Sequence, residues 1–123
     1  MERDAFLFLN EWKNEKNRKP LIIQGARQVG KTWLMKEFGK KAFKKTAYVN
    51  FDQNASLKEI FAKTRNVSDL IEAIGIDAGT TVTPDDTLIV LDEIQECPDA
   101  LTVLKYFNED APEYHVIVAG SLL

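Results

Sequence analysis

The stretch that decides the fold is LIIQGARQVGKT, residues 21–32. Its first three residues form an apolar run typical of a β-strand, and Pro20 before them favours an extended backbone. Residues 25–32 match the pattern GxxxxGK[ST], and Leu34 and Phe38 behind them share one helical face. The stretch therefore predicts a strand, a glycine-bounded loop and a helix in succession, an arrangement in which backbone N–H groups and a helix N-terminus surround phosphate groups.

Each position of this loop has a chemical reason. Gly25 and Gly30 permit backbone angles and close approaches that a Cβ would block. Lys31 is expected to reach the β- and γ-phosphates of a nucleotide, and the Thr32 hydroxyl is an oxygen ligand suited to Mg²⁺. The loop residues between the glycines are expected to bind phosphate through their backbone; they are Ala26, Arg27, Gln28 and Val29. The side chains of Arg27 and Gln28 could contact phosphate or a neighbouring chain, or they could have only a structural role. The alternative interpretation of the whole loop is a glycine-bounded turn with a solvated lysine.

A second motif is LIVLDE, residues 88–93, in which two acids end a continuous apolar run. Such a run is typical of a strand buried on both faces, and its acids emerge at the same edge of a parallel sheet as the phosphate loop. Asp92 is suited to holding Mg²⁺, and Glu93 to orienting and polarising the water that attacks a γ-phosphate. Acids that follow a buried strand are often only solvated caps, so it is the combination of the two motifs that carries the interpretation.

The remaining segments complete an α/β pattern. Two further strands are expected at 47–51 and 115–119, and they alternate with helical segments, which favours parallel pairing. Asp4 is expected to cap an N-terminal helix over 4–13, Ser56 or Ser68 to cap a short helix, and Pro98 to begin another. We therefore expect one domain over 1–123, with the N-terminal helix at 4–13 and the sheet within 20–123.

Composition limits the classes of partner. The 123 residues carry a formal net charge of −3, so no global field attracts the chain to nucleic acid or to an anionic membrane. Clustered lysines at 40–45 are expected to be solvated, and contact with nucleic acid has no further support. No apolar run is long enough to span a bilayer, no secretory signal is visible, and Cys97 is the single cysteine. These features favour a cytoplasmic protein without a membrane partner.

Residues 21–123 resemble the P-loop ATPases of the AAA superfamily, with Gly25 to Thr32 as Walker A and Leu88 to Glu93 as Walker B. More narrowly, GARQVGKT, LDEIQ and the later Gly120-Ser121 pair are similar to a prokaryotic ATPase family whose ATPase region precedes an uncharacterised C-terminal domain. The resemblance implies Mg-ATP binding and hydrolysis, with Lys31 and Glu93 as catalytic residues and Thr32 and Asp92 as magnesium ligands. It also implies that Ser121 is the sensor of the γ-phosphate.

The resemblance further implies a truncated three-layer α/β/α fold whose strands are ordered second, third, fourth, first. The first strand then forms an edge, which we expect to pair with another copy or to be shielded by the N-terminal helix that carries Trp12. Members of the family continue beyond the sensor, so we expect this chain to represent the N-terminal ATPase core. An activating arginine is expected outside it, which predicts weak turnover.

Two other functions remain open at this point. A small-molecule kinase shares the phosphate loop but needs an acceptor pocket, and a nucleotide-dependent switch needs binding without turnover. A GTPase is disfavoured because no NKxD or TKxD motif occurs. His115 is expected to be a surface or partly packed residue rather than a metal ligand, and Cys97, Trp12 and Trp33 to be packing residues, although either tryptophan could flank adenine.

Overall fold

The computed structural model describes residues 2–24 and 29–121. Strands and helices alternate along most of it, as the sequence predicts. In chain order the elements are α1 (Glu2–Lys13), β1 (Leu21–Gln24), α2 (Val29–Ala42), β2 (Lys45–Asn50), α3 (Ala55–Lys63), α4 (Val67–Ala78), β3 (Thr87–Asp92), the 3₁₀ turn η1 (Ile94–Glu96), α5 (Pro98–Asp110) and β4 (His115–Gly120).

The four strands form one sheet in the order β1-β4-β3-β2, and every neighbouring pair is parallel. This confirms the predicted α/β class and the predicted strand order. Residues 52–83 contribute α3 and α4 and no strand, so nothing from that region pairs with β1. Because all four strands run the same way, their carboxyl ends lie along one edge of the sheet, where both sequence motifs are expected to act.

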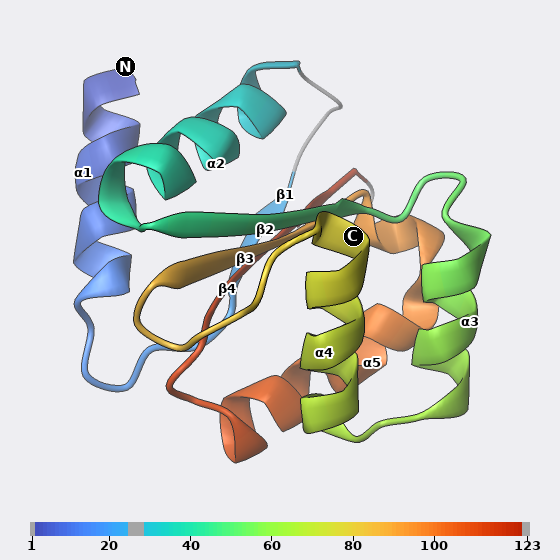
Figure 1. Ribbon diagram of the computed structural model, residues 1–123. Coiled ribbons are helices and arrows are strands. Elements are labelled where there is room, and N and C mark those ends of the chain that lie inside the picture. The colour runs from blue at the N-terminus through green and yellow to red at the C-terminus, as the bar shows by residue number, and fades with distance from the viewer. Residues whose placement is uncertain (1, 25–28, 122–123) are drawn as a thin grey trace.

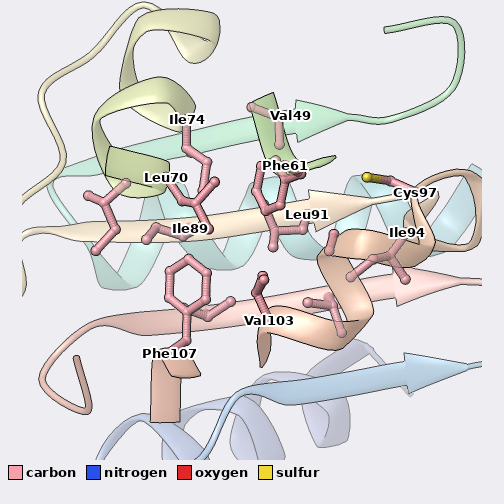
Figure 2. Packing of buried hydrophobic residues seen from close by; sticks show 14 of the residues in the cluster. Val49, Phe61, Leu70, Ile74, Ile89, Leu91, Ile94, Cys97, Val103 and Phe107 are labelled. Carbon is pink, nitrogen blue, oxygen red and sulfur yellow. The ribbon is translucent and has the colours of Figure 1, made fainter. Parts of the chain in front are cut away.

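Helices cover both faces of the sheet and give three layers (Figure 1). Helices α1 and α2 lie on one face, and α3, α4 and α5 lie on the other. Figure 2 shows the larger apolar cluster, in which Leu70 and Ile74 of α4 and Phe107 of α5 pack against Ile89 and its neighbours in the sheet. β3 and β4 are buried along their whole length, which explains why their sequences are continuous apolar runs.

β1 is an edge strand with one covered face. Leu21 and Ile23 pack against the apolar cluster that contains Leu9 and Trp12 of α1, so the N-terminal helix does cover one side of the strand. Ile22 points the other way and is 46% exposed. Pairing of this edge with a second copy stays a prediction.

Helix α5 begins at Pro98 as predicted, whereas the predicted beginnings of α1, α3 and α4 were wrong by two residues. α1 begins at Glu2, two residues before Asp4. The caps of α3 and α4 are Asn54 and Asn66, whose side chains accept the N–H groups of Leu57 at 3.2 Å and Asp69 at 3.0 Å. Ser56 and Ser68 instead lie inside the first turns, because each asparagine two residues earlier can already reach the N–H three residues ahead. None of the helices described is long and apolar enough to cross a membrane.

Candidate functional site

The first part of the site is the N-terminal turn of α2. Gly30, Lys31 and Thr32 lie in this turn. Exposed helical N–H groups and the positive end of the helix dipole favour an anion at such a position. Four predicted phosphate-binding residues lie outside the described part of the chain; they are Gly25, Ala26, Arg27 and Gln28. Of Val29, only the backbone at the helix start is described.

The second part is the end of β3, and the structure brings it to Thr32. The Thr32 hydroxyl donates a hydrogen bond of 2.9 Å to Oδ2 of Asp92, across 60 positions of sequence. Asp92 is only 5% exposed, and its other oxygen, Oδ1, accepts the backbone N–H of Glu93 at 2.9 Å. The two residues predicted as magnesium ligands are therefore adjacent, and both offer oxygen, the donor type that Mg²⁺ prefers.

This oxygen pair fits a magnesium ion whose remaining ligands are phosphate oxygens and water. Among residues 2–24 and 29–121, no group of three or more His, Cys, Asp or Glu residues is arranged to hold a metal by itself. Mg²⁺ commonly binds through one or two protein oxygens together with phosphate oxygens and water. Thr32 and Asp92 provide such a pair, and the helix N-terminus beside Thr32 is of the kind that favours an anion.

Tyr48 is a member of the site that the sequence analysis missed. It lies on β2, and its hydroxyl donates a 2.6 Å hydrogen bond to the same Oδ2 of Asp92 that Thr32 contacts. Burial and then the hydrogen bond to Asp92 raise the pKa of Tyr48 well above its usual value, so the hydroxyl stays a donor. Lys36 of α2 lies 4.2 Å above its ring. The sequence signal that could have indicated Tyr48 is the alternation of side chains along β2. Ala47 and Val49 are buried on one face of the strand, and Tyr48 lies on the other face, towards α2.

Glu93 follows Asp92 in an unusual backbone conformation. Its φ is 52° and its ψ is 46°, in the left-handed region that non-glycine residues seldom adopt. Such strain is frequent at functional sites, where the surrounding structure maintains it. The half-buried side chain accepts a 2.6 Å hydrogen bond from Nε2 of Gln95 in η1. Glu93 is thus held at both its backbone N–H and its carboxylate.

Ser121 lies one residue beyond β4, and the structure connects it to Glu93 through one side chain. The backbone N–H of Ser121 donates to Oε1 of Gln95 at 3.3 Å, and the same Gln95 contacts Glu93. Thr32, Asp92, Glu93 and Ser121 therefore gather at the carboxyl edge of the sheet, as predicted. Gln95 is the last residue of the LDEIQ motif, but its contacts with Glu93 and Ser121 depend on the tertiary structure, so the sequence analysis gave it no role.

Four residues that the sequence analysis discussed lie away from this edge, and they differ in burial. His115 is buried rather than at the surface, since it is only 6% exposed at the opposite end of β4. Cys97 and Trp12 are buried as predicted, and burial raises the pKa of the Cys97 thiol, which disfavours a reactive thiolate. Trp33 was predicted to pack, but it is 43% exposed on α2 because the face of this helix that bears Met35 and Phe38 is the one turned to the sheet.

Concavity alone does not mark the site. A cavity of about 570 Å³ is lined by α4 and the segment 79–82, and it shares no residue with the edge described above. A second cavity of about 330 Å³ lies between α3 and α4. The site is recognised instead by the converging oxygen atoms of Thr32 and Asp92 and by the N-terminus of α2.

A parallel α/β sheet with a helix N-terminus and a paired Thr32 and Asp92 at its carboxyl edge defines the class of P-loop nucleotide-binding proteins. A family model described as an AAA domain matches residues 17–123. The chain therefore belongs to the AAA domain family, which indicates a nucleotide-binding, ATPase-like function. No curated protein and no solved structure matches the chain.

Proposed function

We propose that this chain binds Mg-ATP and hydrolyses it to ADP and phosphate. The observation that carries the proposal is the 2.9 Å contact between Thr32 and Asp92, with Glu93 directly after it. Two oxygen ligands and one adjacent carboxylate at a phosphate-binding helix terminus are the groups that hydrolysis of a γ-phosphate requires. Family membership supports the same function.

Each residue has a distinct part in this proposal. The loop backbone and Lys31 bind the β- and γ-phosphates and balance their charge. Thr32 and Asp92 would hold Mg²⁺, which neutralises phosphate oxygens when it is bound. Glu93 accepts a hydrogen bond from the attacking water and can receive its proton. A new bond forms between the water oxygen and the γ-phosphorus, and the bond from that phosphorus to the β,γ-bridging oxygen breaks. Ser121, which Gln95 connects to Glu93, would sense the γ-phosphate.

Binding and turnover should separate by mutation. Lys31→Ala should weaken Mg-ATP binding at least about a hundredfold, because it removes a charge that contacts phosphate in the bound state. Glu93→Gln should keep the affinity and lower the single-turnover rate by about 10²–10⁴, because it removes a general base. Calorimetric titration measures the first effect and phosphate release the second.

Two matched variants control these measurements. Lys40→Ala changes an exposed lysine of the same helix, and Glu96→Gln changes an exposed glutamate three residues from Glu93. Both should behave as wild type. Unchanged Mg-ATP affinity in Lys31→Ala would contradict the phosphate-loop assignment. Formation of ADP without release of phosphate, and only after an acceptor is added, would indicate a kinase instead.

Nucleotide choice is a further test of the same site. Because the sequence has no guanine-reading motif, GTP should not displace a fluorescent nucleotide better than ATP. A preference for GTP of about tenfold, which is about 1.4 kcal/mol, would refute the adenine assignment. If hydrolysis depends on an activating arginine from another chain, steady-state turnover should stay well below about 1 s⁻¹, since such a residue contributes about 10³–10⁵ in rate.

A further inference from the structure

Gln95 makes two directional contacts that link different elements of the site. Its Nε2 donates to Oε1 of Glu93 at 2.6 Å, and its Oε1 accepts from the backbone N–H of Ser121 at 3.3 Å. A carboxylate can only accept and a backbone N–H can only donate, so a single orientation of the amide satisfies both contacts. The side chain therefore bridges the residue after β3 to the residue after β4.

The end of β4 leaves room for this amide because position 120 is glycine. A Cβ added to Gly120 would lie 2.3 Å from Oε1 of Gln95, and 3.3 Å from Cγ2 of Ile94. Gly120 is buried in β4, and Gln95 is half-buried above it. The absence of a side chain at 120 is thus a condition for the position of Gln95, independently of its two hydrogen bonds.

From these contacts we infer that Gln95 is a positioning residue for hydrolysis, which sets the direction of the Glu93 carboxylate relative to the end of β4. The inference rests on the proposed function, because it assigns Gln95 an effect through Glu93. The backbone of Glu93 is already fixed by Asp92 and by its left-handed conformation, so Gln95 restrains the carboxylate at the far end of that side chain. A shift of Ser121 would move Gln95, and with it the carboxylate.

A purely structural role makes a different prediction. If Gln95 only fastens η1 to β4, its loss lowers the free energy of unfolding and slows every reaction of the site alike. If it acts through Glu93, its loss matters only while Glu93 has its carboxylate. A double-mutant cycle between positions 93 and 95 separates these two roles.

The experiment uses the 123-residue chain in excess over ATP, with single-turnover phosphate release and Mg-ATP titration. Gln95→Met keeps the length of the side chain and removes both hydrogen bonds. We expect a rate lower by about ten- to a hundredfold, as for a misplaced catalytic group, and an Mg-ATP dissociation constant within about twofold of wild type. In the Glu93→Gln background, adding Gln95→Met should change the residual rate by less than about twofold.

Gly120→Ala gives an independent route to the same displacement. The added methyl group should push the flexible end of Gln95 away, so the variant should lose rate to a similar extent while it still binds Mg-ATP. In a Gln95→Ala background the displaced group is absent and only the contacts with Ile94 remain, so Gly120→Ala should have a smaller effect than in wild type. Unfolding by urea identifies any variant whose loss of rate comes only from a smaller folded population.

The outcomes distinguish the inference from the function on which it rests. A wild-type chain that neither binds Mg-ATP nor releases phosphate overturns both. If wild type hydrolyses ATP and Gln95→Met does so equally fast, or if Gln95→Met slows wild type and Glu93→Gln by the same factor, only the positioning role is overturned.

Discussion

The two ends of the sheet use polar groups in different ways. At the carboxyl end, side chains bind one another: Thr32 and Tyr48 share one oxygen of Asp92. At the amino end, side chains bind backbone carbonyls and aromatic rings. The ring of His115 lies edge-on to Phe43 at 5.0 Å, and its Nδ1 is 3.0 Å from the carbonyl of Pro84.

The same contrast holds for the cations of the amino end. Arg18 donates to the carbonyl of Lys13 at 3.0 Å and lies 5.9 Å from the centre of the Trp12 ring. Trp12 itself donates to the carbonyl of Lys19 at 2.8 Å. Backbone carbonyls cannot move without moving the chain, so these contacts fasten the end of α1 to the segment that leads into β1. Side chains that bind one another can exchange a partner for a ligand, so the carboxyl end is suited to chemistry.

The largest effect should come from breaking the amino end. Trp12→Ala should lower the free energy of unfolding by about 3–5 kcal/mol, because it removes a ring that is 4% exposed in the cluster between α1 and the sheet. The additional stability that saturating Mg-ATP provides should stay as in wild type. Urea unfolding with and without Mg-ATP measures both quantities.

Trp33→Ala is the matched control, because that ring is 43% exposed on α2. It should cost less than about 0.5 kcal/mol. Equal costs for the two tryptophans would contradict the assignment of the amino end as the fastening region.

Sequence patterns predicted what is local or periodic in this molecule. The run before Gly25 and the run before Asp92 predicted the strands, and the expected meeting of Thr32 with Asp92 followed from the common direction of parallel strands. The prediction that Trp12 packs was confirmed on the buried face of α1. These predictions succeeded because each depends on spacing within one segment or on a rule of sheet topology.

Partners that depend on a tertiary contact were not predictable in this way. Tyr48 reaches Asp92 only because β2 lies beside β3, and Gln95 reaches Ser121 only because Gly120 leaves space for it. His115 was expected nearer the surface because nothing in its own strand shows that α1 covers it. The helix caps were misplaced for a local reason, since Asn54 and Ser56 are both good capping residues and lie two positions apart.

A second prediction sharpens the comparison at the carboxyl end. Tyr48→Phe removes one of the two hydroxyl donors to Oδ2 of Asp92, and it should cost about 1.5–3 kcal/mol of unfolding free energy, as for a hydrogen bond to a charged group. Unlike Trp12→Ala, it should also raise the Mg²⁺ concentration needed for ATP binding, by about tenfold, because the carboxylate is less well oriented. Titration of fluorescent ATP at several Mg²⁺ concentrations measures this shift.

Tyr114→Phe is the corresponding control, because that side chain packs against the apolar cluster on the other face of the sheet. It should leave the Mg²⁺ dependence unchanged. If Tyr48→Phe loses stability without any change in Mg²⁺ dependence, Tyr48 belongs with the fastening contacts and the contrast between the two ends is weaker than described.

The smallest effect concerns the pH dependence of the amino end. Burial lowers the pKa of His115, and the positive charges of Arg18 and Lys13 lower it further, whereas the hydrogen bond with the Pro84 carbonyl raises it. The carbonyl can only accept, so Nδ1 carries a proton and Nε2 is the nitrogen that would titrate. His115 is the single histidine of the chain, which makes its contribution separable from those of other residues.

At pH 7.5 this ring is neutral in both the folded and the unfolded chain, so it adds no pH dependence there. As the pH falls below about 6.5, the unfolded chain takes up a proton that the folded chain resists, and stability is lost at up to about 1.4 kcal/mol per pH unit until the lower folded pKa is reached. His115→Gln should remove this component. Urea unfolding of both proteins between pH 5.0 and 7.5 gives the difference, in which the titration of carboxylates cancels. Parallel curves for the two proteins would show that the folded ring takes up its proton as readily as the unfolded one, and that the amino end does not hold His115 in a neutral state.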